Sequence, residues 1–122
     1  MNRDHLSKMR ARKAAKDYMY GANLGAQSDE LSDTVLAVKF ECHVSTIKRI
    51  RERIPVSVLT REDHALIREC AAEKARIDQQ LPKFSKAYLT KHYGISVEAL
   101  DIELDLAGFV NPRTQKKKRR VA

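Results

Sequence analysis

Two stretches of the chain share one pattern at an offset of 53 positions, and this repeat constrains the fold more than any other feature. Residues 31–50 read LSDTVLAVKFECHVSTIKRI, and residues 84–103 read FSKAYLTKHYGISVEALDIE. In both, a serine is followed by apolar residues at helical spacing, in the pairs Ser32/Ser85, Leu36/Leu89, Phe40/Tyr93, Val44/Val97 and Ile47/Leu100. Such a repeat predicts one small helical structure that is built twice.

In the first copy, the spacing predicts a helix over residues 33–40, a turn at 41–43 and a second helix over 44–53. Ser32 suits the position before the first helix, because its hydroxyl can accept a hydrogen bond from a free amide of the first turn. Pro55 ends the second helix, since its ring disfavours helix in the residue before it. A small core is expected from Leu36, Ala37, Phe40, Val44, Ile47 and Ile50.

The second copy has the same turn with different residues. Gly94 stands where the first copy has Glu41, at a position that favours glycine because the backbone there takes a positive φ. A residue with a side chain costs on the order of 1 kcal/mol in that conformation. Ser96 is expected to cap the last helix, as a better cap than His43, and Gly108 or Asn111-Pro112 is expected to end it.

Longer helices are predicted outside the repeat. With 4 Gly and 3 Pro in 122 residues, the composition favours helix over sheet. We expect a helix over residues 3–20, a glycine-containing loop over 21–30, and the longest helix over 60–81. Thr60 and Asp63 can cap that longest helix reciprocally. Its apolar stripe is predicted to be Leu66, Cys70, Ile77 and Leu81, with Ile67 and Ala71 beside it.

The apolar spacing of residues 31–53 resembles the helix-turn-helix of phage and bacterial transcriptional regulators. The resemblance rests on Leu36, Ala37, Phe40, Val44, Ile47 and Ile50. It implies an all-α fold in which two tandem helix-turn-helix units are joined by a long central helix. Residues 1–57 are expected to hold the N-terminal helix and the first unit, residues 58–112 the long helix and the second unit, and residues 113–122 a disordered basic tail.

Charge distinguishes the two copies. The net charge is +8, which favours polyanionic partners. Residues 1–57 carry +4, residues 58–112 carry −2 and residues 113–122 carry +6. The second copy has no Lys or Arg between Ser96 and Asn111, and its last helix carries Glu98, Asp101, Glu103 and Asp105. Phosphates would be repelled by that helix, so we expect the first copy to face DNA.

Double-stranded DNA is therefore the expected partner, and the site residues divide into two groups. The base-reading residues are predicted to be Ser45, Thr46, Lys48 and Arg49, with Arg49 first because an arginine facing guanine is the commonest specific contact. The predicted phosphate-binding residues are Ser32, Lys39, Arg51, Arg53, Lys8, Arg10, Arg12, Lys13, Arg113, Lys116, Lys117, Lys118, Arg119 and Arg120.

The last helix is more apolar than one short helix needs, which predicts packing on the long helix or on a second subunit. Since one reading helix covers only a few base pairs, we expect a homodimer on an inverted repeat. The predicted dimerisation residues are Leu100, Leu104, Leu106 and Phe109. By the resemblance, the protein is a transcriptional regulator and a repressor, of the kind that phages and mobile elements carry.

Other functions have weaker support in the sequence. Asp101, Glu103 and Asp105 are spaced by two in a predicted helix, so they cannot share a face as catalytic carboxylates would, and no enzyme activity is expected. The histidines are scattered, so we expect no metal. The sequence has no phosphate-cradling glycine loop, and we expect no cofactor and no small-molecule ligand. Cys42 and Cys70 are read as reduced buried thiols. RNA binding would call for a stacking platform, and only 6% of residues are aromatic.

The location is expected to be the cytoplasm of a bacterium or a phage-infected cell. No apolar run approaches the roughly 20 residues of a membrane span, and the charged N-terminus lacks the apolar stretch of a secretion signal. Membrane binding is also disfavoured by the weak apolar face of the basic N-terminal stretch. Two alternatives stay open: a DNA-targeting module of a nuclease or transposase system, and a protein-binding adaptor with non-specific affinity for nucleic acid.

Overall fold

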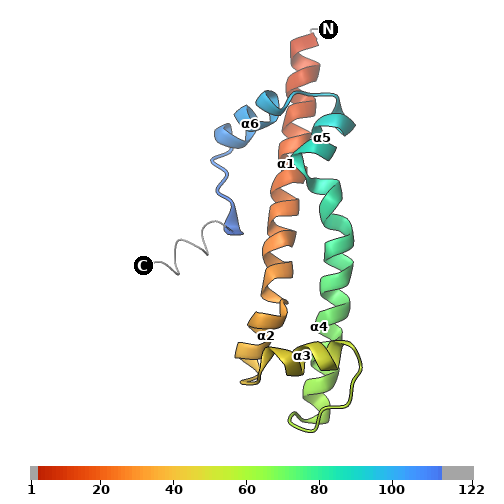
Figure 1. Cartoon of the computed structure of the whole chain (residues 1–122). Coiled ribbons are helices and arrows are strands. Elements are labelled where there is room, and N and C mark those ends of the chain that lie inside the picture. Colours follow the sequence, from red (N-terminus) through yellow and green to blue (C-terminus); the bar gives the residue numbers. More distant parts are fainter. Residues whose placement is uncertain (1–2, 114–122) are drawn as a thin grey trace. The chain divides into compact units, whose positions relative to one another are not determined.

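A computed structural model describes residues 3–113, and its regular structure over that range is entirely helical. The elements are α1 (Arg3–Glu30), α2 (Asp33–Lys39), α3 (Val44–Arg51), α4 (Arg61–Gln80), a 3-10 turn η1 (Leu81–Phe84), α5 (Lys86–Tyr93) and α6 (Val97–Leu106) (Figure 1). The expected all-α class is confirmed. None of the helices in this range combines the length and the apolar character that crossing a membrane requires.

These elements form two compact units, divided at other places than the sequence predicts. One unit is continuous and comprises residues 27–79, whereas the other is discontinuous and combines residues up to 26 with residues from 80 onward. The expected ranges 1–57 and 58–112 are therefore corrected. The first helix pair, α2–α3, packs with the long helix that follows it in the chain, and α5–α6 packs with α1.

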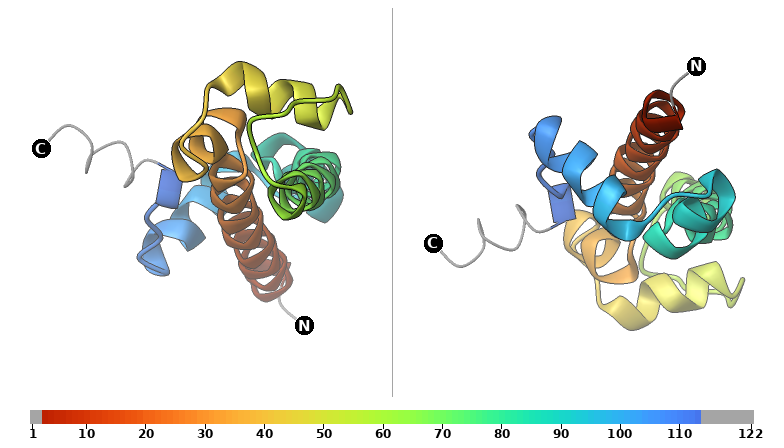
Figure 2. Two further views of the ribbon diagram at one scale, coloured as in Figure 1. Left: turned by 90° about the horizontal axis from the view of Figure 1, so that it is seen from below. Right: turned by 90° about the horizontal axis from the view of Figure 1, so that it is seen from above.

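The core of the continuous unit lies where α2, α3 and α4 meet. Its buried residues are Leu36, Ala37, Ile47, Ile50 and Ile67, and half-buried Phe40, Val44 and Cys70 pack against them. The left view of Figure 2, from below, shows α3 (yellow) running from α2 (orange) toward α4 (green). The predicted core of the first copy is confirmed, with Phe40 and Val44 at its edge.

The face of α4 that reaches this core differs from the predicted stripe. Ile67 is fully buried, whereas Leu66 is 41% exposed. Ile67 and Ile77 lie on the buried side, and Cys70 is half-buried. The sequence is compatible with burial of either Leu66 or Ile67, because both lie at helical spacing from Cys70. The reciprocal cap is confirmed, since the Asp63 amide donates to the Thr60 hydroxyl and the Thr60 amide to the Asp63 carboxylate.

The core of the discontinuous unit is built from α1, α5 and α6. Its buried residues are Ala14, Ala15, Leu89, Leu100 and Leu104. The Tyr18 and Phe109 rings pack edge to face, with centroids 5.6 Å apart. Two polar contacts join the helices: the Tyr93 hydroxyl donates to Asp17, and Lys86 Nζ lies 2.8 Å from Asp101 Oδ1.

Helix α1 continues through residues 21–30, where the sequence predicts a loop. The two glycines in that stretch are buried within the helix. Phe84 lies directly on Gly21, so that a Cβ at this position would collide with it, and the Phe84 ring is edge-on to Tyr20. The Arg113 side chain lies beside Gly25. These glycines permit close approach to the helix, and the packing outweighs the roughly 1 kcal/mol by which glycine disfavours helix relative to alanine.

The repeat seen in the sequence recurs as a repeat of backbone conformation. Ser32 and Ser85 cap α2 and α5, each accepting a hydrogen bond from the amide three residues later. The turn that follows contains a left-handed residue in both copies, Glu41 with φ of 52° and Gly94 with φ of 65°. The predicted positive φ at Glu41 is thereby confirmed.

The second helix of each pair also begins and ends in the same way. His43 Nδ1 accepts from the Ser45 amide at 3.1 Å, and the Ser96 hydroxyl accepts from the Ala99 amide at the same distance. Each helix ends before a left-handed residue, Arg53 with φ of 63° and Gly108 with φ of 66°. Arg53 therefore lies just beyond α3, two residues past the end of the helix, and not in its last turn as predicted.

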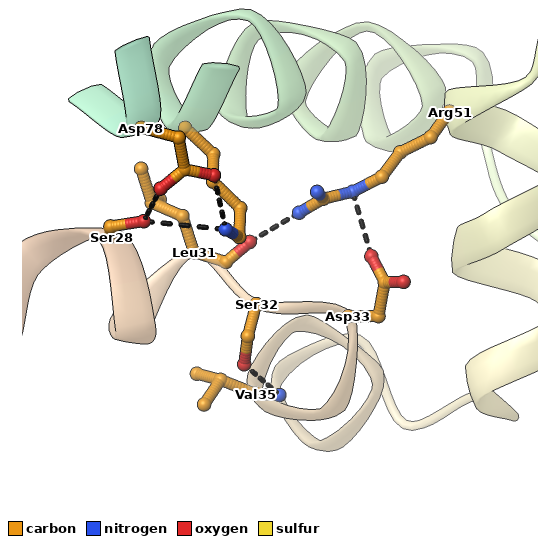
Figure 3. Close-up of polar contacts among 8 residues, drawn as sticks. Ser28, Leu31, Ser32, Asp33, Val35, Arg51 and Asp78 are labelled. Carbon is orange, nitrogen blue, oxygen red and sulfur yellow. Dashed lines mark hydrogen bonds and ion pairs between the residues drawn. The ribbon is translucent and has the colours of Figure 1, made fainter. Parts of the chain in front are cut away.

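A polar cluster in the continuous unit joins the end of α1 to α4 (Figure 3). The buried Ser28 hydroxyl donates to Asp78 at 2.6 Å, and Lys74 Nζ contacts both Asp78 and Ser28. Hydrogen bonds from Lys74 and then Ser28 lower the pKa of Asp78 below its usual 3.8. Deprotonated Asp78 is thus favoured in the folded chain.

We therefore expect Asp78 to contribute stability that is present above about pH 4 and is lost as the pH falls through its lowered pKa. Asp78→Asn should remove this contribution and flatten the fall in stability as the pH drops below about 4. The measurement is the urea midpoint by circular dichroism as a function of pH. The control is Glu69→Gln, at an exposed carboxylate of the same helix. Equal acid profiles for wild type and Asp78→Asn would contradict the assignment.

Candidate nucleic-acid interface

Helix α3 presents one polar face outward and one apolar face inward. Ile47 and Ile50 are fully buried. Ser45, Lys48 and Arg49 are exposed, and their spacing of three and four residues places them on the opposite side of the helix. Three of the four predicted base-reading residues therefore share one accessible surface.

Thr46 differs from the other predicted base readers. It is half-buried and lies between the outward face and the side that packs on the core. Glu52, which caps the C-terminal end of α3, is exposed and falls on the outward face at the next turn after Lys48. Glu52 was not among the predicted site residues. Its helical spacing of seven from Ser45 was the available signal.

His43 positions the N-terminal end of this face. Its Nδ1 lies 2.8 Å from the Ser45 hydroxyl and accepts a hydrogen bond from the Ser45 amide. The capping imidazole therefore fixes the first turn of α3 and holds the Ser45 side chain at the helix N-terminus. Sequence reasoning ranked His43 below Ser96 as a cap, and this positioning contact was not anticipated.

Arg51 belongs to the structure of the unit, which corrects its prediction as a phosphate-binding residue. Its side chain is 17% exposed, and its guanidinium donates to the Leu31 carbonyl. Nε lies 3.0 Å from Asp33 Oδ1, forming an ion pair (Figure 3). Arg51 thus connects α3 to the junction between α1 and α2.

We expect Arg51→Met to destabilise the chain by about 1–3 kcal/mol, because it leaves Asp33 and the Leu31 carbonyl without their charged donor. Met keeps the apolar part of the side chain, so the loss of stability measures the contribution of the guanidinium group. The measurement is the free energy of unfolding in urea. The matched variant is Arg53→Met, at an exposed position, which should change stability by less than about 0.5 kcal/mol. Equal effects of the two variants would contradict the structural role of Arg51.

The other predicted phosphate contacts of this unit remain accessible. Lys39 is exposed at the end of α2, with Nζ 6.0 Å from the centroid of the Phe40 ring. Arg53 is exposed beyond the end of α3. Ser32 is half-buried, and its hydroxyl oxygen accepts from the Val35 amide at 3.4 Å, so its main contact is the cap of α2.

The remaining predicted phosphate contacts belong to the discontinuous unit. The predicted contacts Lys8, Arg10, Arg12 and Lys13 are exposed on α1. Arg12 lies 3.8 Å from Glu103 of α6. Arg113 lies against Gly25. The predicted contacts Lys116, Lys117, Lys118, Arg119 and Arg120 lie outside the described residues, as does the rest of the predicted tail from residue 114 onward.

The predicted dimerisation residues divide between core and surface. Leu100 and Leu104 are buried against α1 and α5 within one chain, so they are not available to a second subunit. Phe109 is half-buried on Tyr18. Leu106 is 76% exposed. The apolar residues of α6 thus pack largely on α1 and α5, whereas the sequence predicted packing on the long central helix or on a second subunit.

Two of the acidic residues of α6 are paired inside the unit. Lys86 Nζ lies 2.8 Å from Asp101, and the Asp101 hydrogen bond is the main cause of the raised pKa of Lys86. Glu103 is the acidic partner of Arg12. Glu98 and Asp105 are exposed. The outward surface of α6 therefore remains acidic, in contrast to that of α3.

The described residues offer little for metal or redox chemistry. Within residues 3–113, no three His, Cys, Asp or Glu side chains gather closely enough to hold a metal ion. Cys42 and Cys70 are free and half-buried in the core of the continuous unit, and burial raises the pKa of the Cys42 thiol. Thiolate formation at Cys42 is thereby disfavoured.

No protein family model, no curated protein and no solved structure matches the chain. The candidate interface therefore stands on the geometry and charge of α3.

Proposed function

We propose that this chain is a sequence-specific binder of double-stranded DNA that acts as a transcriptional regulator, with α3 as its recognition helix. The observation that carries the proposal is the two-sided construction of α3. Ile47 and Ile50 anchor its inner face completely, while Ser45, Lys48 and Arg49 project from the outer face. A recognition helix needs this combination, because it must be held rigidly while its polar side enters the major groove.

The contrast between the two helix pairs supports assigning the reading role to α3. Both pairs share caps and left-handed turns, which supports the interpretation as tandem helix-turn-helix units joined through α4. Of the second helices of the two pairs, α3 carries exposed cations and α6 has no Lys or Arg. The equivalent surface of α6 carries Glu98 and Asp105, which would face the phosphates with like charge.

In this proposal, the exposed residues of the continuous unit have separate roles. Arg49 reads a guanine, and Ser45 and Lys48 contact neighbouring base edges. Lys39 and Arg53 bind phosphates, which sets the register of α3 on the duplex without reading sequence. A homodimer then reads an inverted repeat with half-sites about one helical turn apart, and it represses transcription by occupying that operator.

The test is a selection of bound duplexes from a random pool, using the full chain. We expect enrichment of a palindromic motif with half-sites spaced by about 10 base pairs. A long asymmetric motif would overturn the regulator in favour of a DNA-targeting module of a nuclease or transposase system. Retention of DNA with no enriched motif would overturn sequence-specific reading altogether and favour an adaptor.

A further inference from the structure

The outward face of α6 combines two exposed aliphatic residues with two carboxylates. Ile102 is 58% exposed and Leu106 is 76% exposed. Glu98 and Asp105 are exposed on the same side of the helix, at the spacing i, i+4, i+7 and i+8 with the two aliphatic residues. Leu100 and Leu104 lie on the opposite side, buried in the core.

The repeat makes this face unusual. At the offset of 53 positions, Ile102 and Leu106 correspond to Arg49 and Arg53 of the first copy. An exposed surface that is basic on one helix pair is therefore aliphatic and acidic on the other. Contiguous aliphatic residues rimmed by polar ones are typical of protein–protein contacts.

The same unit carries a second exposed face of complementary chemistry. On the first turns of α1, Leu6 and Met9 are 41% and 42% exposed. Arg10 and Lys13 are exposed on the same side of the helix, at the spacing i, i+3, i+4 and i+7. Burial in α1 begins at Ala11, and the first turns extend beyond α5 and α6 (Figure 1).

The two faces match in charge and in apolar content. Each has two aliphatic or thioether side chains, one face adds two carboxylates, and the other adds two cations. They do not meet within one chain, because the side of α1 that packs on α5 and α6 is formed by Ala14, Ala15 and Tyr18, away from Leu6 and Met9. In a dimer with a two-fold axis, the α1 face of each copy can contact the α6 face of the other copy. Both faces of both copies are then covered.

We propose that the chain forms a homodimer in which the Leu6–Lys13 face of α1 in each copy covers the Glu98–Leu106 face of α6 in the other. Contact between the two α6 helices is disfavoured, because it would bring the carboxylates of both copies together. The proposal assigns Arg10 and Lys13 to the dimer contact and not to DNA phosphates. It does not depend on DNA binding by α3.

The test uses complementary charge reversal and sedimentation equilibrium on the full chain without DNA. Glu98→Lys with Asp105→Lys, and Arg10→Glu with Lys13→Glu, should each weaken the dimer at least about 100-fold, because like charges then face each other. An equal mixture of the two double variants should restore a heterodimer. All four positions are exposed, so the variants should keep the circular dichroism spectrum of the wild type.

The matched control for Arg10→Glu with Lys13→Glu is Lys83→Glu with Lys91→Glu, which makes the same change in net charge at exposed positions outside both faces. It should leave the dimer unchanged. A wild-type chain that stays monomeric up to about 100 μM, far above the Kd of specific complexes, would overturn the proposal. So would a dimer that neither double variant weakens, or two weakened variants that fail to pair when mixed.

Discussion

Ile67→Ala should lower the free energy of unfolding by about 2–5 kcal/mol, the range found when a fully buried isoleucine is truncated. Ile67 is the residue through which α4 enters the core beneath Leu36, Ile47 and Ile50. The cavity would lie directly behind α3. The measurement is urea denaturation followed by circular dichroism. Tyrosine emission checks that the discontinuous unit stays folded in native buffer, because all four tyrosines lie there and the chain has no tryptophan.

Leu66→Ala provides the matched control for this prediction. It removes a side chain of the same volume from the neighbouring residue of the same helix, but Leu66 is 41% exposed. We expect its cost to stay below about 1 kcal/mol, as at other surface positions. Comparison of the two variants also tests whether Leu66, as predicted from the sequence, or Ile67, as in the structure, is the buried residue. A larger loss for Leu66→Ala than for Ile67→Ala would contradict the assigned register of α4.

Lys48→Glu with Arg49→Glu should nearly abolish binding to the selected DNA site. Each contact that is lost costs about 1–3 kcal/mol, so the pair should cost about 2–6 kcal/mol before repulsion by the new carboxylates is counted. Both residues are exposed, so stability should change by less than about 0.5 kcal/mol for each. The measurement is a fluorescence anisotropy titration of the labelled duplex at a fixed salt concentration.

Lys83→Glu with Lys91→Glu is the control for net charge, since it adds the same negative charge to the discontinuous unit and leaves α3 unchanged. An equal loss of binding in the two double variants would show a general electrostatic effect and would contradict the role of α3 as the recognition helix. Arg49→Ala then distinguishes a base-specific contact from sequence-independent electrostatic attraction to DNA. It should weaken the selected site by about 1–3 kcal/mol and random DNA very little, whereas Arg53→Ala should weaken both and reduce the salt slope by about one.

Local rules predicted the features that depend on a few neighbouring residues. Ser32 and Ser96 cap their helices as expected, and Ser85 caps α5 at the position that matches Ser32, because a cap needs only a hydroxyl and the free amides of the next turn. The left-handed residues at Glu41 and Gly94 follow from the turn that the repeat requires. The inner face of α3 also follows from its spacing, which is why Ser45, Lys48 and Arg49 are exposed together.

The same rules failed where a distant segment decides the outcome. Residues 21–30 contain two glycines and were predicted to be a loop, yet Phe84 and Arg113 pack on those glycines and the helix continues. Arg51 was grouped with the DNA-facing cations by its charge. Its contacts with Leu31 and Asp33 depend on how α3 crosses the start of α2, which no spacing rule contains.

The sequence by itself determined the helical class, the repeat at an offset of 53, the caps and turns within it, and the opposite charge of its two outward faces. These follow from residues that are close in the chain, where helical geometry limits the choices. Only the tertiary structure decided which long helix each pair packs against, that Ile67 and not Leu66 is buried, and that Leu100 and Leu104 are internal. Those outcomes depend on the packing of side chains that are far apart in the sequence. The local pattern is compatible with more than one buried helix face, and close packing decides which face is buried.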